Sequence, residues 1–279
     1  MARERRRLLI APERLARQAP RLELTAEESR YLTRVLRYGD GDGFAVTDGA
    51  GGLWEAVLEE RGWARLEQPL ATPLLRMAAP APQLVLAAAV VKRDYDLVVR
   101  MAVELGVDRL VPWLSDHGAV LGGLRPERWR TIAREAAEQC ERLWLPEILE
   151  PRAAREDLGA PAAGGVAAGS ATGMVGPPLR LFATTRRGQL PAMEAVLERV
   201  FPPAAPAGET LHPGRAEQAP AALWLACGPE GGWSSEEEQG AEAAGWLPVS
   251  LGPQILRSST AAVAGLARLA AWRTGRWGG

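Results

Sequence analysis

The sequence has little cysteine, histidine or lysine, and it contains no long apolar run. Its two cysteines, Cys140 and Cys227, are too few for a disulfide framework or a cysteine-rich metal site, which favours a reducing cytoplasm. With only two histidines a zinc site is also disfavoured, and we expect no metal. The sequence has no stretch of about eighteen apolar residues, so no membrane span is predicted. The charged start lacks the apolar core of a secretory signal.

Basic residues are almost all arginine, because Lys92 is the one lysine among 33. A lone lysine is retained either because its compact ammonium matters or by chance. The net charge of −1 hides an excess of arginine at the N-terminus, where residues 1–37 hold ten arginines against five glutamates. Such a surplus suits a polyanion such as RNA, but it also fits a solvated basic face. Charge alone leaves both interpretations open.

The first part of the chain, residues 1–75, is typical of a small and mostly β domain. Thr25 and Glu28 form a capping box that predicts a helix ending near Gly39. A glycine-rich turn at 49–52 predicts a hairpin. The proline-rich stretch 69–82 is a plausible domain boundary. The strands predicted here are residues 21–24, 43–48, 53–60 and 63–67.

From residue 80 to 279 the pattern changes to alternating strands and helices. Residues 83–90 form a continuous apolar run, which is typical of a strand buried on both faces. Residues 151–178 and 202–222 are rich in Ala, Gly and Pro and predict loops. The alternation predicts an α/β fold, a mostly parallel sheet with helices on both faces. The predicted strands are 83–90, 109–113, 181–183, 223–227 and 247–251, and the predicted helices are 94–105, 126–142, 191–200, 234–244 and 259–273.

Two glycine-bearing loops directly follow predicted strands. They are Gly228-Pro-Glu-Gly-Gly232 and Gly252-Pro-Gln-Ile-Leu-Arg257. Ligands of open parallel sheets bind beyond the carboxyl ends of the strands, so both loops point to one edge. Neither loop has the sequence pattern of a phosphate-binding loop. The absence of that pattern favours a nucleoside-like ligand held by backbone contacts. One Gly-Pro turn is more often a plain connector, but two so close together indicate a binding site.

Ordered motifs along the chain carry a family resemblance. They are Gly228-Pro-Glu-Gly-Gly232, Pro248-Val-Ser-Leu-Gly-Pro253, Ile255-Leu-Arg257, Thr260-Ala261, Lys92 with Asp94, Glu104-Leu-Gly-Val107, Ala133-Arg-Glu-Ala-Ala-Glu-Gln139 and Tyr31-Leu-Thr-Arg-Val-Leu-Arg37. In these segments the chain resembles the bacterial 16S ribosomal RNA uridine-N3 methyltransferases of the SPOUT superfamily. The resemblance spans nearly the whole chain except the two Ala/Gly/Pro-rich loops.

The resemblance implies a fold and an assembly. The C-terminal part, residues 80–279, would be a methyltransferase domain threaded into a trefoil knot, an exception to the rule that chains stay unknotted. The N-terminal part, residues 1–75, would be a PUA-like RNA-binding β-barrel. The protein would act as a homodimer on 16S ribosomal RNA or the small ribosomal subunit.

The resemblance also implies a cofactor, S-adenosylmethionine, bound in the knot. By position its contacts are Ala226, Gly228, Gly231, Gly232, Val249, Leu251, Gly252, Leu256 and Arg257. The basic N-terminal segment and the matched positions supply the candidate RNA contacts, which are Arg5, Arg6, Arg7, Arg34, Arg37, Lys92 and Arg142.

The chemistry of such a reaction points to two candidate catalytic residues. The N3 atom of uracil carries a proton at neutral pH and becomes a good nucleophile only when that proton leaves. Arg257 is the first candidate to stabilise the developing negative charge, and a salt bridge is the alternative for it. Glu230 either accepts the proton or is a structural carboxylate bonded to loop amides. The chain departs from the family pattern at Gln254 and Ser259, where arginine and glutamate are usual.

Other functions stay open beside this one. A related SPOUT enzyme would modify a ribose hydroxyl or another base in ribosomal or transfer RNA. An RNA-binding or ribosome-assembly protein would keep the knot without catalysis, and Ser259 is the best argument for it. A dinucleotide-dependent dehydrogenase is disfavoured because the phosphate fingerprint is missing.

Overall fold

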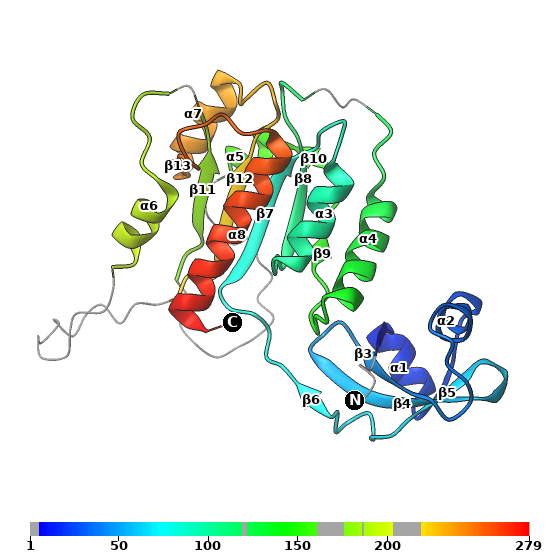
Figure 1. Cartoon of the computed structure of the whole chain (residues 1–279). Helices are drawn as coiled ribbons and strands as arrows, with labels where there is room; N and C mark the ends of the chain where they lie inside the picture. The colour runs from blue at the N-terminus through cyan, green and yellow to red at the C-terminus, as the bar shows by residue number, and fades with distance from the viewer. Residues whose placement is uncertain (1–5, 119–121, 161–175, 186, 203–218, 279) are drawn as a thin grey trace, which may run out of the picture. The chain divides into compact units, whose positions relative to one another are not determined.

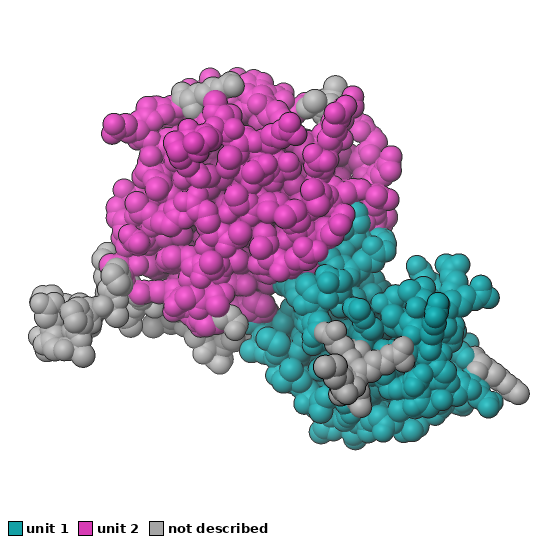
Figure 2. Space-filling view, viewed as in Figure 1, with its two compact units in different colours: residues 1–79, 131–145 teal, residues 80–130, 146–279 magenta. Residues whose placement is uncertain are grey.

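The chain is described here by a computed structural model (Figure 1) that covers residues 6–118, 122–160, 176–185, 187–202 and 219–278. It divides into two compact units (Figure 2). The first unit comprises Met1–Ala79 and Thr131–Leu145, and the second comprises Pro80–Arg130 and Pro146–Gly279. The segment Thr131–Leu145 therefore groups with the N-terminal residues, although the sequence placed it in the C-terminal domain.

The first unit is built on a mostly antiparallel sheet with the order β1-β3-β4-β5-β2, and β6 pairs with β4. Its hairpin turns at Asp48, whose Oδ1 accepts the N–H groups of Ala50 and Gly52 at 2.7 and 2.8 Å. The predicted strands of this unit are confirmed. The strands are β1 (Arg7–Leu9), β2 (Arg21–Glu23), β3 (Gly43–Thr47), β4 (Gly52–Glu59), β5 (Trp63–Leu66) and β6 (Leu75–Arg76).

Short helices accompany this sheet: α1 (Pro12–Gln18), α2 (Ala26–Arg30) and the 3-10 turn η2 (Glu60–Gly62). The predicted capping box is confirmed, since Thr25 Oγ1 accepts the N–H of Glu28 and the Glu28 carboxylate accepts that of Thr25. Helix α2 continues directly into a π-helical turn, η1 (Tyr31–Val35). Such turns are rare and often occur at functional sites.

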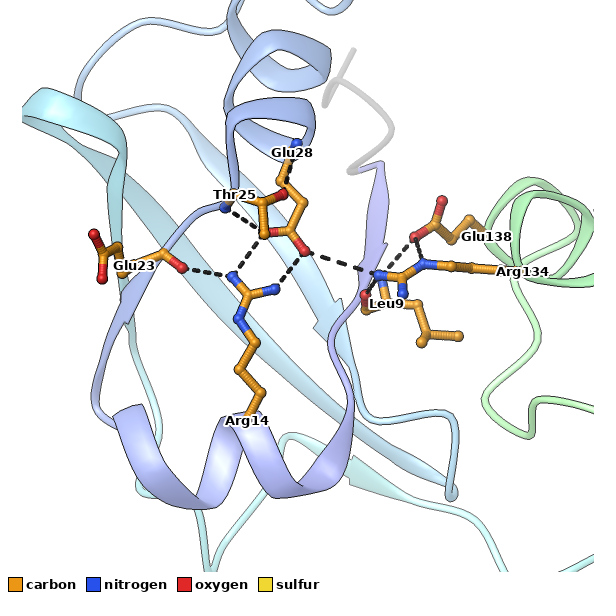
Figure 3. Close-up of polar contacts among 7 residues, drawn as sticks. All are labelled: Leu9, Arg14, Glu23, Thr25, Glu28, Arg134 and Glu138. Carbon is orange, nitrogen blue, oxygen red and sulfur yellow. Dashed lines mark hydrogen bonds and ion pairs between the residues drawn. The ribbon is translucent and has the colours of Figure 1, made fainter. Parts of the chain in front are cut away.

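Charged side chains tie the second half of α4 (Pro126–Gln139) into the first unit (Figure 3). Arg14 donates to both carboxylate oxygens of Glu28 at 2.6 and 2.7 Å. Arg134 lies 3.8 Å from Glu28 and also donates to the carbonyl of Leu9. Glu138 accepts the N–H of Leu9 at 2.8 Å. These contacts fix strand β1 and α2 against the same helix.

The two carboxylates of this network differ in pKa. Burial raises the pKa of Glu138, because one backbone N–H and a distant guanidinium do not repay the lost hydration. Burial also opposes ionisation of Glu28, but hydrogen bonds from Arg14 and from the Thr25 N–H outweigh it and lower the pKa of that carboxyl. Glu28 is therefore the charged anchor of the network.

The second unit is an α/β fold around a parallel sheet, as predicted. Its strand order is β10-β8-β7-β12-β11-β13, with β9 paired to β8, and each strand pairing found among the described residues of this sheet is parallel. The strands are β7 (Gln83–Ala89), β8 (Arg109–Leu114), β9 (Glu147–Ile148), β10 (Arg152–Ala153), β11 (Leu179–Ala183), β12 (Ala222–Cys227) and β13 (Leu247–Val249).

Helices cover both faces of this sheet (Figure 1). On one face α8 packs on β7 and β12, and Gly265 is needed there because a Cβ would lie 2.6 Å from Leu225. On the other face α5 and α7 pack around a tryptophan cluster in which Trp113 lies 5.8 Å from Trp246. The helices of this unit are α3 (Tyr95–Glu104), the start of α4, α5 (Ala154–Leu158), α6 (Met193–Val200), α7 (Ser235–Ala243) and α8 (Ser258–Trp277).

Three predicted boundaries were wrong. Helix α4 ends at Gln139 and not at 142, because Glu141 takes the left-handed conformation with φ 62°. Part of the predicted loop 151–178 is ordered as β10 and α5, since the Ala/Gly/Pro-rich composition begins only after Leu158. Helix α8 continues through Gly275 to Trp277 and ends at Gly278, which has φ 69°. The predicted loop residues 161–175 and 203–218 lie outside the described part.

Candidate functional site

The candidate site lies at the carboxyl ends of three neighbouring strands, β11, β12 and β13. Ala183 at the end of β11 is in register with Cys227 of β12 and Val249 of β13. The segments that follow the three strands therefore meet at one edge of the sheet. They enclose a cavity of about 270 Å³, which we call the glycine-loop cavity. This size is near the lower end of the roughly 300–1,000 Å³ typical of small-molecule sites.

The first glycine loop depends on the absence of side chains. A Cβ on Gly228 would lie 2.9 Å from the ring of Trp233, and a Cβ on Gly231 would lie 3.0 Å from His117. Gly232 has φ +78°, a conformation that favours glycine. Trp233 is itself held in place, since its Nε1 donates to the carbonyl of Ala183 at 2.9 Å. The loop therefore presents backbone to the cavity.

The second glycine loop is joined to the first by a buried serine. Ser258 donates its hydroxyl proton to the carbonyl of Gly228 at 2.5 Å and is 6% exposed. Gly252, with φ +139°, turns the chain after β13, and its N–H donates to Ser250 Oγ at 3.2 Å. The start of α8 is thereby fixed to the loop that follows β12, as a shared ligand site requires.

A second capping box fixes helix α7 directly behind the first loop, as predicted. Ser234 Oγ accepts the Glu237 N–H at 3.1 Å, and the Glu237 carboxylate accepts the Ser234 N–H at 2.8 Å. The same carboxylate accepts from Ser115 Oγ and the Asp116 N–H, both at 3.0 Å. A hydrogen bond from Ser234 and the guanidinium of Arg155 lower the pKa of Asp116. The segment after β8 is thus bonded to the same loop.

Most of the predicted cofactor contacts line this cavity, but three do not. Ala226 and Val249 are fully buried in the sheet, and Arg257 is exposed at the N-cap of α8 between two lining residues. The predicted contacts that line it are Gly228, Gly231, Gly232, Leu251, Gly252 and Leu256. Glu230 and Gln254 also line it and are exposed.

Glu230 and Ser259 were singled out in the sequence. Among the described residues no hydrogen bond from a loop amide reaches the Glu230 carboxylate, which is exposed, so the structural alternative for this residue has no support. The N-cap of α8 is Arg257, no side chain caps this helix, and Ser259 is its second residue.

Several lining residues were not found from the sequence. Thr184 and Thr185 follow β11, and Arg187 comes shortly after them. The sequence predicted β11 as a strand but could not show that it lies between β12 and β13. Glu238 also lines the cavity, and the capping box identified only its helix.

Exposed arginines gather at the π-helical turn of the first unit. Arg30 precedes η1, Arg34 lies in it and Arg37 follows it with φ 57°. All three are exposed, and within the described ranges no carboxylate is paired with them. Val35 beside them is 66% exposed. This arginine patch (Arg30, Arg34 and Arg37) is a candidate surface for RNA phosphates.

The other candidate RNA contacts have varied surroundings. Arg6 is exposed, but Arg7 is only 18% exposed and forms an ion pair with Glu141 at 2.7 Å. Arg142 is half-buried. Lys92 is exposed and lines a separate, more polar cavity of about 550 Å³ in the second unit. Arg5 lies outside the described residues.

Neither a metal-binding cluster nor a membrane-spanning helix is found in the part of the chain that the structure describes. No group of three or more His, Cys, Asp or Glu side chains is arranged there to hold a metal ion. None of the described helices is both long and apolar enough to cross a membrane.

Comparison with known families matches both parts of the chain. A model of the RNA methyltransferase domain matches residues 79–165 and 202–270. A model of the RNA methyltransferase PUA domain matches residues 24–62. The first match contains both glycine loops and the second contains the arginine patch. The two matches define the class of the protein, an RNA methyltransferase with a PUA domain.

Curated relatives and solved structures narrow the class. Ribosomal RNA small subunit methyltransferase E of Synechocystis sp. is 34% identical over 94% of this chain and 76% of its own length. The protein of that name from Mycobacterium bovis is 29% identical over 90% of this chain and 86% of its own length. The structure of the Neisseria gonorrhoeae protein, bound to S-adenosylmethionine, covers 96% of this chain and 98% of its own, with a TM-score of 0.68 at 24% identity. That last likeness shows the fold alone.

The chain belongs to the ribosomal RNA small subunit methyltransferase E family.

Proposed function

We propose that this protein transfers the methyl group of S-adenosylmethionine to N3 of a specific uridine in 16S ribosomal RNA. The observation that carries the proposal is the glycine-loop cavity, where two glycine loops, from the strands on either side of β11, present backbone to a ligand. The names of the curated relatives and the cofactor bound in the related structures support it. The uridine N3 target comes from the resemblance of the motifs.

The cavity fits a nucleoside-like cofactor. Gly228 packs directly on the Trp233 ring, where a Cβ would lie 2.9 Å away, and Gly232 and Gly252 have positive φ with nothing within 4 Å of an added Cβ. Backbone donors and acceptors at such positions can approach a ligand closely. Bound there, S-adenosylmethionine supplies an electrophilic methyl group. The residues that we propose to hold it are Gly228, Gly231, Gly232, Leu251, Gly252 and Leu256.

Two side chains near the cavity are suited to the uridine. Arg257 is exposed and lies between the lining residues Leu256 and Ser258. Its guanidinium can engage the oxygens of uracil and stabilise the charge that develops as N3 loses its proton. Glu230, exposed at the cavity and free of loop hydrogen bonds among the described residues, is the candidate to accept that proton.

The rest of the proposal concerns assembly and RNA binding. The N-terminal residues 1–75 would bind RNA, with the arginine patch as the main phosphate contact. The domain 80–279 would carry the cofactor and the trefoil knot, and two copies would form a homodimer in the cytoplasm. The assembly and the knot rest on the resemblance of the motifs.

The test is mass spectrometry of 16S ribosomal RNA nucleosides from cells with and without the gene. The proposal expects 3-methyluridine at one position to disappear with the gene and to return with a wild-type copy. Loss of a ribose methylation instead would indicate the alternative enzyme of the same superfamily. No change in any nucleoside would favour the RNA-binding protein without catalysis.

A further inference from the structure

Three consecutive glutamates of helix α7 have three different surroundings. Successive residues of a helix point about 100° apart, so Glu236, Glu237 and Glu238 face different sides. Glu236 is 71% exposed and pairs with Arg155 at 2.9 Å. Glu237 is 1% exposed and forms the capping box. Glu238 is turned toward the glycine-loop cavity and lines it. The first two glutamates have structural partners that account for them.

Glu238 is held at the cavity wall by a buried threonine. Thr184 is 7% exposed, and its hydroxyl donates to Glu238 Oε1 at 2.6 Å. Within the part of the chain that the structure describes, the other carboxylate oxygen, Oε2, has only Arg187 Nε near it, at 3.5 Å, too far for a strong hydrogen bond. The Glu238 side chain is 21% exposed. One oxygen is therefore fixed, and the second keeps acceptor capacity toward the cavity.

Arg187 supplies the opposite charge beside it. Among the described residues that line the cavity, Arg187 is the one cation. It also donates to Glu242, one turn further along α7, which does not line the cavity. Its side chain is 35% exposed, so the guanidinium keeps donors for a ligand. A carboxylate and a guanidinium thus stand next to each other at one wall.

This pair is complementary to an α-amino acid. An α-ammonium group needs an acceptor of negative charge, and an α-carboxylate needs a cation with several donors. Resting on the proposed function, we propose that Glu238 and Arg187 bind the α-ammonium and the α-carboxylate of the methionyl part of S-adenosylmethionine. Thr184 is a positioning residue that holds the Glu238 carboxylate toward the cavity.

The competing account is that Glu238 only balances the charge of Arg187. Glu242 separates the two accounts, because it pairs with the same guanidinium on the same helix without lining the cavity. If balancing charge is all that matters, removing either carboxylate should have the same effect. If Glu238 touches the ligand, only its removal should weaken ligands that carry the amino acid.

The experiment is calorimetric titration of the full-length protein with three ligands. S-adenosylmethionine and S-adenosylhomocysteine carry the amino-acid group, and 5′-methylthioadenosine lacks it. Glu238→Gln keeps the size and the hydrogen bond with Thr184 but removes the charge. We expect this variant to lower the affinity for the first two ligands by about tenfold or more, the size of one charged hydrogen bond. Its affinity for 5′-methylthioadenosine should stay within about twofold of the wild-type value.

Two further variants complete the test. Arg187→Gln should change the three affinities in the same way as Glu238→Gln. It can replace Glu238→Gln in the test if that variant does not fold. Glu242→Gln is the matched control and should leave all three ligands within about twofold. If 5′-methylthioadenosine binding weakened as much as that of the other two ligands, Glu238 would contact the nucleoside and the proposal would be overturned. Unchanged affinity of both cavity variants, Glu238→Gln and Arg187→Gln, for all three ligands would also overturn it. A wild-type protein that binds none of the ligands would refute the proposed function itself.

Discussion

Arg257 occupies a position where a side chain can reach a substrate without filling the cofactor cavity. It caps α8 between Leu256 and Ser258, and Ser258 is bonded to the first glycine loop. Its backbone is therefore fixed while its side chain is exposed. This arrangement suits a residue that contacts an incoming base.

Replacing Arg257 tests its role in the transition state. Arg257→Ala should slow methyl transfer by a factor corresponding to about 3 kcal/mol or more, because it removes the stabilisation of charge on uracil. Arg257→Lys should remain slow, since an ammonium lacks the planar fork. Single-turnover rates with S-adenosylmethionine affinity measured in parallel check this. A fully active Arg257→Ala protein would show that another group stabilises this charge, and would leave Glu230 as the remaining candidate catalytic residue.

Gly228 offers a second test at the scale of one residue. A methyl group in Gly228→Ala would lie 2.9 Å from Trp233, whose ring is buried and hydrogen-bonded to Ala183. The loop must then shift, and we expect cofactor affinity to fall by about tenfold or more, as when a ligand is deprived of one or two backbone hydrogen bonds. Titration of the variant with S-adenosylmethionine measures this.

The control for Gly228→Ala is a glycine with free space. Gly275 lies in α8 with nothing within 4 Å of an added Cβ. Gly275→Ala should leave cofactor affinity unchanged and stabilise the helix by about 0.4–1 kcal/mol. Equal affinities of both variants would show that the close approach at Gly228 is not used for the ligand.

Secondary structure was largely predictable where the sequence has local signals. Both capping boxes, Thr25 with Glu28 and Ser234 with Glu237, are present with both of their hydrogen bonds. Strand β1 and helix α1 were missed because they are short and have mixed polarity. Strand β1 depends on contacts distant in sequence, such as the Leu9 N–H that donates to Glu138.

The candidate site was predictable in part for the same reason. The glycine loops follow strands that the sequence shows, so their shared edge could be inferred. Thr184 enters the site because β11 lies between β12 and β13, and Glu238 because it lies on the side of α7 that contacts Thr184. Strand order is set by packing and not by a local pattern, so neither residue carried a signal that sequence alone could resolve.

The network between α2 and α4 predicts a dependence of stability on pH. The pKa of Glu28 is lowered in the folded protein, although burial alone would raise it, because Arg14 and the Thr25 N–H bind the carboxylate. A lowered pKa stabilises the fold fully above the unfolded value of about 4.3, and this stabilisation is lost as the pH falls through the folded value. Glu28 therefore contributes at pH 7 and not in strong acid.

Glu28→Gln should accordingly lower the free energy of unfolding at pH 7 by about 1.5–3 kcal/mol, the size of a charged hydrogen bond. The difference from wild type should shrink below about pH 4. Urea unfolding at both pH values measures it. Glu27→Gln, an exposed neighbour, is the control and should be near wild type throughout. A deficit that stays constant with pH would exclude the charge as its cause.

At the scale of the whole molecule, RNA affinity should depend on the arginine patch. Removing one phosphate-binding side chain lowers the slope of log K against log salt by about 0.7–0.9. Replacing Arg34 and Arg37 with alanine should therefore flatten the slope by roughly 1.4–1.8. Filter binding of a small-subunit RNA fragment across salt concentrations measures this.

Arg7 is the matched comparison for the patch. It is largely buried and paired with Glu141, so Arg7→Ala should lower the free energy of unfolding and leave the salt slope of RNA binding nearly unchanged. A slope that falls with Arg7→Ala and not with the patch variant would place the RNA-binding surface elsewhere.

The central claim is that the glycine-loop cavity presents a methyl donor to uridine N3. The most direct measurement incubates the purified full-length protein with S-adenosylmethionine carrying a labelled methyl group and with small subunits from cells that lack the gene. Nuclease digestion and mass spectrometry then locate the label. The account predicts one labelled 3-methyluridine in 16S ribosomal RNA with the wild-type protein and a strongly reduced amount with Gly228→Ala. Label on a ribose or on another base, or no label on subunits or free RNA, would contradict it.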